Sequence, residues 1–90
     1  MVSFNLPVAA GSKALSSYGF KIDGKDMDTP LKGSRVYTVR SHYGMHSVEF
    51  REVYGSLIPK VKRGFAQLNF ENGATFDIVE SKDHFEFVRL

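Results

Sequence analysis

The sequence has no cysteine, no tryptophan and no long hydrophobic run. The absence of cysteine excludes a disulfide framework, thiol catalysis and thiolate metal sites, and it suits a reducing compartment. The apolar run at residues 6–10 is too short for a signal-peptide core, and no stretch is long enough to span a bilayer. We therefore expect a cytoplasmic protein that makes no membrane contact.

The rest of the composition is typical of a folded domain. Of the 90 residues, 42% are hydrophobic, and 12 Lys and Arg nearly balance 10 Asp and Glu. Such a chain lies outside the disordered regime, and we expect one domain over residues 1–90. Residues 34–64 hold six basic and two acidic side chains, whereas residues 65–90 hold two basic and five acidic ones. This pattern predicts a dipolar surface, which could pair with a second copy or attract a charged partner. The alternative is two solvated faces that fold against each other.

Turn residues recur at the spacing of short strands. The eight glycines lie 5 to 11 residues apart, and the segments between them are rich in Val, Phe, Tyr and Ile. The sequence therefore predicts a mainly β fold, a small antiparallel sheet or open barrel of about six short strands. With residues 7–17 as the one candidate helix, a β-dominated α+β fold is the alternative. We expect Asp23-Gly24 to form a hairpin turn after a strand that ends at Ile22.

The last third of the chain is predicted to form a three-stranded meander. A three-residue loop at 71–73 pairs Phe70 with Ala74 and gathers apolar side chains on one face. A four-residue turn at 81–84 then sets Ile78 opposite Phe87. This register places four phenylalanines in the core: Phe70, Phe76, Phe85 and Phe87.

A second hairpin is predicted in the middle of the chain, with its loop at 42–44. In this register Val36, Val48 and Phe50 face the core. Arg35 and Arg51 oppose each other, and their like charges require Glu49 or a bound anion between them. The exposed face is a candidate protein-contact patch, because aromatic, Met and Arg side chains are enriched at interfaces. Its members are Arg35, Tyr37, Met45, Glu49 and Arg51.

The segment 63–70, Arg-Gly-Phe-Ala-Gln-Leu-Asn-Phe, resembles the aromatic octapeptide of RNA-recognition motifs, Lys/Arg-Gly-Phe/Tyr-Gly/Ala-Phe-Val-x-Phe/Tyr. The resemblance covers these eight residues, with Gln67 in place of an aromatic, and the rest of the chain does not follow the family. In that family the strand offers a basic group and stacking rings to single-stranded bases. With Phe65 on the outer face, the resemblance and the nearby basic residues outline a candidate single-stranded RNA or DNA site. It comprises Arg40, Lys60, Lys62, Arg63 and Phe65; the alternative is an ordinary strand with a solvated basic lead-in.

Other chemistry-bearing residues form no recognisable site. His42 and His46 are four residues apart, but no acidic residue completes a metal-ligand spacing, so we expect neither a metal nor another cofactor. Small ribonucleases combine His, Glu, Arg and Tyr on an antiparallel sheet, and these residue types occur on the middle hairpin. A ribonuclease is therefore a remote alternative, although strand alternation fixes no acid against a base.

A domain of this size has little volume for a deep catalytic pocket. The sequence therefore favours a non-enzymatic module for protein interaction or structural support, an accessory protein acting through an exposed sheet face or edge. Self-association into a homo-oligomer is one form of such a contact. A single-stranded nucleic-acid-binding domain is the main alternative.

Overall fold

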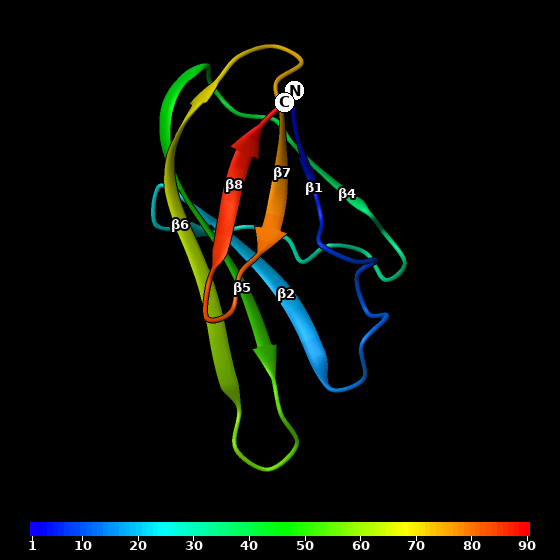
Figure 1. The fold of residues 1–90 in the computed structure, drawn as a ribbon. Helices are drawn as coiled ribbons and strands as arrows, with labels where there is room; N and C mark the ends of the chain where they lie inside the picture. Colours follow the sequence, from blue (N-terminus) through cyan, green and yellow to red (C-terminus); the bar gives the residue numbers. More distant parts are fainter.

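The structure, a computed structural model, describes all residues 1–90 and contains eight strands and no helix. The β5–β6 hairpin is the longest element and projects beyond the other strands (Figure 1). No helix long and apolar enough to cross a membrane is present. The strands are β1 (Val2–Asn5), β2 (Ser16–Ile22), β3 (Lys25–Asp26), β4 (Val36–Val39), β5 (Gly44–Tyr54), β6 (Lys60–Phe70), β7 (Thr75–Glu80) and β8 (Phe85–Arg89).

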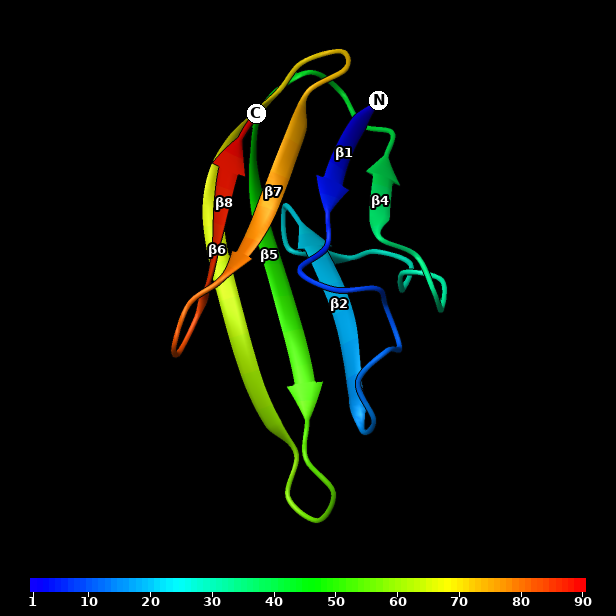
Figure 2. The ribbon, with the colours of Figure 1, turned by 45° about the vertical axis from the view of Figure 1, so that its right-hand side comes forward.

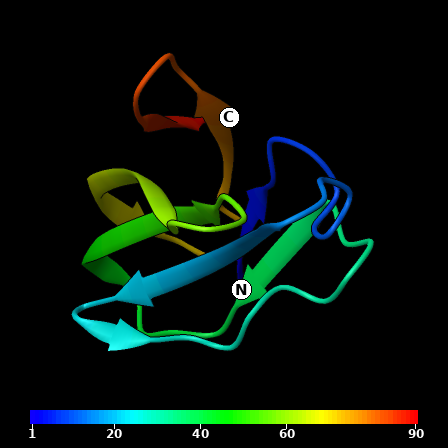
Figure 3. The ribbon, with the colours of Figure 1, turned by 90° about the horizontal axis from the view of Figure 1, so that it is seen from below.

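The strands form two sheets of four. Sheet A has the order β4-β1-β7-β8, and sheet B has the order β3-β2-β5-β6. The mainly β prediction is confirmed. The two sheets do not join into a closed barrel (Figure 3). The prediction of antiparallel pairing is wrong at one place, because β1 lies parallel to β7, although it is antiparallel to β4.

One hydrophobic cluster of 16 buried residues fills the space between the sheets. Phe4 of β1 lies at its centre and is fully buried. Its ring lies 5.3 Å from Phe20 of sheet B and 5.6 Å from Phe76 of sheet A, measured between ring centroids. Burying a side chain of this size contributes about 1.5 to 3 kcal/mol, so β1 ties the two sheets to a shared core.

The candidate helix at residues 7–17 is not formed. Gly11 and Leu15 have φ angles of 77° and 58°, which a right-handed helix does not contain. The backbone of Ala10 bonds instead to the segment after β3: its N–H donates to the Ser34 carbonyl at 2.8 Å, and its carbonyl accepts from Gly33 at 2.7 Å. This loop therefore satisfies its polar groups against a neighbouring loop, and β2 begins at Ser16.

Two of the predicted turns are confirmed. Asp23 and Gly24 both have positive φ angles, 52° and 79°, as a two-residue hairpin turn requires, and they join β2 to β3. The turn at residues 81–84 joins β7 to β8, with Ile78 opposite Phe87. Of the four phenylalanines placed in the core, Phe87 is partly buried and the other three are fully buried.

The other two predicted hairpins are wrong. Residues 71–74 carry the chain from sheet B to sheet A, so β6 pairs with β5 along its whole length and β7 pairs with β1 and β8. Residues 40–43 make a similar crossing, so β4 pairs with β1 instead of β5. As a result Val36 is exposed, whereas Val48 and Phe50 are buried as predicted.

Candidate protein-contact face

The outward side of sheet B is a broad surface built from alternate residues of β2, β5 and β6, which lie side by side (Figure 2). In these strands one set of alternate side chains enters the core and the other set points outward. We call the outward set the outer face of sheet B. Its members are Ser17, Gly19 and Lys21 from β2, Met45, Ser47, Glu49, Arg51 and Val53 from β5, and Val61, Arg63, Phe65, Gln67 and Asn69 from β6.

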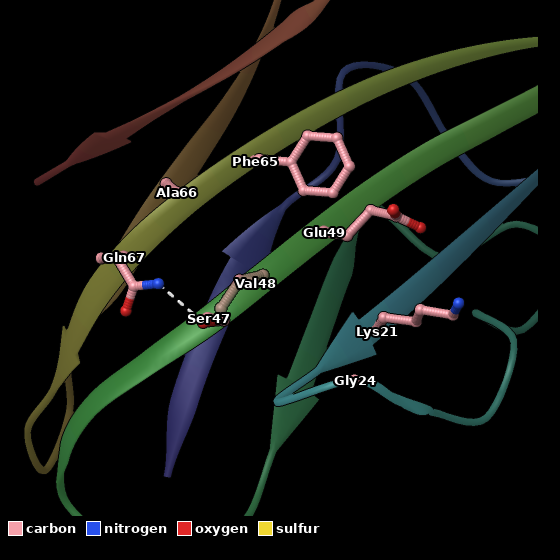
Figure 4. A pocket seen from close by; sticks show the side chains of 8 residues that line it. All are labelled: Lys21, Gly24, Ser47, Val48, Glu49, Phe65, Ala66 and Gln67. Atoms are coloured by element: carbon pink, nitrogen blue, oxygen red, sulfur yellow. Dashed lines mark hydrogen bonds between the residues drawn. The ribbon is translucent and has the colours of Figure 1, made fainter.

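Phe65 is the most conspicuous member of this face. Six of the eight phenylalanines are fully buried, whereas the Phe65 side chain is 71% exposed. Its ring stands beside a shallow depression of about 300 Å³ that is also lined by Lys21, Glu49 and Gln67 (Figure 4). An apolar ring in water contributes little to folding, so this position offers surface that a contact can bury.

Charged side chains surround Phe65 in a fixed arrangement. The register sets Arg51 directly opposite Arg63, and the carboxylate of Glu49 lies between them, 3.4 Å from Arg51 and 3.7 Å from Arg63. Arg51 also reaches Asp26 of β3 at 3.3 Å. Ion pairs this close to solvent stabilise the fold by about 0 to 1 kcal/mol, so their main effect is to hold the guanidinium groups in place. An acidic side chain thus separates opposed arginines, as predicted, but the second arginine is Arg63 and not Arg35.

Polar groups next to Phe65 are also held in position. The Gln67 amide donates a hydrogen bond to the Ser47 hydroxyl at 2.6 Å, across β5 and β6 (Figure 4). The Asn69 amide donates to the Glu71 carboxylate at 2.8 Å. Ordering these side chains before contact lowers the entropy that a partner must offset.

The structure brings together only part of the predicted contact patch. Met45, Glu49 and Arg51 lie on the outer face of sheet B, and Met45 is 63% exposed. Tyr37 belongs to β4 of sheet A, where its ring stacks on Phe20 at 4.3 Å and its hydroxyl donates to the Asp28 carbonyl at 2.6 Å. Arg35 lies just before β4 and is exposed on that side. The separation follows from the pairing of β4 with β1.

The predicted nucleic-acid residues are divided in the same way. Phe65 points outward from sheet B as expected, and Arg63 lies on the same face of β6. Lys60 and Lys62 lie on the opposite side of β6, and Lys62 is held by Glu80 at 2.8 Å with its ammonium 5.1 Å from the Phe85 ring centre. Arg40 lies at the other end of the molecule, near Met1 and His42. No continuous track of free basic groups runs past Phe65.

The histidines and the remaining ribonuclease-type residues do not form a shared site. His46 is engaged on both ring nitrogens, Nδ1 by Asp23 at 2.5 Å and Nε2 by the His42 carbonyl at 2.7 Å. Tyr37 and Arg35 are on sheet A, away from Glu49 and Arg51 of sheet B. No group of three His, Cys, Asp or Glu side chains is close enough to hold a metal ion.

The tip of the β5–β6 hairpin is an exposed apolar feature that was not predicted from the sequence. Leu57 is 94% exposed and Ile58 is 76% exposed. Gly55, with a φ angle of 107°, turns the chain there, and an added Cβ would lie only 2.7 Å from the Ile58 carbonyl oxygen. The signal was present in the sequence: two aliphatic residues stand between a glycine and a proline, where a turn normally carries polar residues.

No protein-family model, curated protein or solved structure matches this chain.

Proposed function

We propose that this protein is a non-enzymatic module that binds another protein through the outer face of sheet B. The single observation that carries the proposal is the exposure of Phe65 in a chain that buries six of its eight phenylalanines completely. Aromatic, Met and Arg side chains are enriched at protein interfaces, and all three types lie on this face. The absence of cysteine supports placing the contact in a reducing compartment such as the cytoplasm.

The charges around Phe65 support a protein partner. Arg51 and Arg63 are both paired with Glu49, so the face presents alternating signs. Alternating charge fits a polypeptide that offers complementary side chains, and it repels a phosphate backbone where the carboxylate stands. The face therefore combines an exposed aromatic side chain with charged neighbours, residue types that are enriched at interfaces.

Co-purification with matched variants tests this function. Phe65→Ser removes the ring from the outer face of sheet B, and Val88→Ser removes an apolar side chain that is 47% exposed on sheet A. Each tagged variant is recovered from the source cells, and its bound proteins are compared with those of the wild type. We expect a protein that the wild type and Val88→Ser retain and that Phe65→Ser loses. Equal retention by all three, or no bound protein above an unrelated tagged control, contradicts the proposal.

Single-stranded nucleic-acid binding is a second candidate because Phe65 and Arg63 stand together on an open face. Base stacking on the Phe65 ring predicts binding that persists when salt screens the charge of Arg63. Fluorescence anisotropy of a short single-stranded RNA and its DNA counterpart measures this at low and near-physiological salt. Binding that survives physiological salt and falls with Phe65→Ala supports this second candidate over a protein partner.

A further inference from the structure

The outer edge of β6 is a long strand edge without a hydrogen-bonding partner. β6 is the last strand of sheet B and pairs with β5 at all of its 11 positions without a bulge. It contains no proline. Natural proteins usually shorten, bend or cover such an edge, because its free backbone groups attract another strand.

The register identifies the backbone groups at this edge. In an antiparallel ladder, successive residues direct their N–H and C=O to alternate sides. The Ser47 carbonyl accepts a hydrogen bond from the Asp23 N–H, so the odd-numbered residues of β5 direct their backbone groups toward β2. The even-numbered residues of β5 therefore bond to β6. Even-numbered residues of β6 are therefore paired, and odd-numbered ones face the open edge. The Asn69 carbonyl supports this assignment, because it faces away from β5 and accepts a hydrogen bond from the Arg89 side chain at 3.3 Å.

The middle of this edge makes no hydrogen bond to another element, although β8 packs against β6 at Gly64 from the core side. No backbone bond outside the strand ladders and no side-chain bond involves the backbone of Val61, Arg63, Phe65 or Gln67. The neighbouring strand β8 leaves an open groove of about 450 Å³ beside residues 63–66. Of these residues, Arg63 and Phe65 belong to the outer face of sheet B, so the edge and the face meet at Phe65.

We propose that two copies of this chain pair antiparallel through β6, about a two-fold axis at Phe65, and so join two sheets B into one continuous sheet. This inference rests on the proposed function and names a second copy as the partner. The axis sets Arg63 opposite Gln67 of the second copy and Val61 opposite Asn69 of the second copy. All of these are edge-facing residues, as antiparallel pairing requires.

The side chains favour this axis over one at Arg63. The two Phe65 rings meet on the same face, where an aromatic pair buries surface that each copy leaves exposed. An axis at Arg63 would set two guanidinium groups directly opposite each other, which is unfavourable. Two-fold pairing uses the longest free edge of each copy, and the other edge strands, β3, β4 and β8, have only two, four and five residues. The assembly therefore closes as a dimer.

Cysteine trapping tests the register, because the natural chain has no cysteine. Phe65→Cys places a thiol on the axis, where the two Cα atoms of a hydrogen-bonded pair lie about 5.5 Å apart, within disulfide range. Val61→Cys is the control, since its position opposes Asn69 and not itself. We expect rapid disulfide dimers from Phe65→Cys and from the double variant Val61→Cys/Asn69→Cys, and few from Val61→Cys alone. Equal rates for Phe65→Cys and Val61→Cys would overturn the register.

Sedimentation velocity tests the pairing without a new thiol. Gln67→Pro removes an edge N–H and leaves the β5–β6 bonds intact, whereas Gln67→Ala keeps that N–H. We expect dimers for the wild type and Gln67→Ala and monomers for Gln67→Pro, with equal strand content by circular dichroism. A monomeric wild type overturns the two-fold pairing. If that monomer still binds a different protein in a Phe65-dependent manner, the proposed function stands, and if it does not, both fail.

Discussion

At the scale of single residues, His46 is the side chain most tightly tied to the charge state of its neighbours. Its two ring nitrogens contact a carboxylate and a backbone carbonyl, which are both acceptors, so only the doubly protonated ring satisfies both. The hydrogen bond that His46 Nδ1 donates to the Asp23 carboxylate raises the pKa of His46, against the opposing effect of burial and with help from the His42 carbonyl. The same bond lowers the pKa of Asp23. The ring also stacks on Phe70 with centroids 4.5 Å apart.

This geometry predicts a loss of stability as pH rises. Because the folded pKa of His46 lies above its unfolded value, the stabilisation is complete below about pH 6.5 and disappears as pH passes the folded pKa. Urea denaturation at pH values from about 6 to about 9 measures the effect. His46→Gln is expected to flatten this dependence, and His42→Ala, which keeps the carbonyl, is expected to retain it. His84, whose pKa Asp83 and Glu86 raise, adds an exposed contribution that His84→Ala removes separately. An unchanged slope in His46→Gln would be inconsistent with this role.

Gly64 is the glycine with the least room. A Cβ built there would collide with the Phe85 backbone carbonyl, whereas a Cβ at Gly19 would meet only the guanidinium of Arg51, which can move aside. We therefore expect Gly64→Ala to lower the free energy of unfolding by about 1 to 3 kcal/mol, the usual range for overpacking. Gly19→Ala is expected to cost less. Denaturant melts of the two variants decide the point, and an equal loss in both would show that β6 and β8 can separate freely.

At the scale of strands, local patterns predicted hairpins joined by short turns and missed crossings between sheets. The Asp23-Gly24 turn and the register of β7 with β8 follow from two to four residues of turn chemistry. Alternation also assigned Phe65 and Phe70 to opposite faces of β6. It could not reveal that residues 71–74 change sheets, because alternation defines the faces of a strand and not its neighbours.

The small strand β1 carries an element-level prediction. It lies between β4 and β7 in sheet A, and Phe4 touches rings from both sheets. Phe4→Ala is expected to cost about 3 to 5 kcal/mol through a large internal cavity. That is a large part of the about 5 to 13 kcal/mol typical of a chain this long, so Phe4→Leu provides a milder variant. Thermal and urea unfolding measure both. A loss below that of Gly64→Ala would mean that β1 is not central to the core.

At the scale of the whole molecule, ion pairs connect parts of the chain that differ in charge. Lys62, from the basic middle, binds Glu80 of the acidic end at 2.8 Å, and this bond lowers the pKa of Glu80. Lys13, from the first third of the chain, also lies 3.6 Å from the Glu80 carboxylate. The uneven charge read along the sequence is thus partly neutralised by folding, which leaves a mixed-charge outer face on sheet B.

The sequence predicted which side chains of the candidate face are exposed, but not which strands bring them together. Met45, Glu49, Arg51 and Phe65 were assigned to exposed faces from alternation, and all lie on the outer face of sheet B. They form one surface because β5 pairs with β6. The sequence pattern had instead predicted that β5 pairs with β4 and β6 with β7. Tyr37 and Arg35 were misplaced by the same error, since β4 is held by β1 in the other sheet.

The most direct measurement is site-specific photocrosslinking in the source cells. A benzophenone amino acid replaces Phe65 in one variant and Val88 in another, so that the same probe samples the outer faces of sheets B and A. We expect irradiation to yield protein adducts, including the dimer, from the probe at position 65 and few from the probe at position 88. Equal yields at the two positions, or no adduct at position 65, would contradict a protein-contact role for the outer face of sheet B.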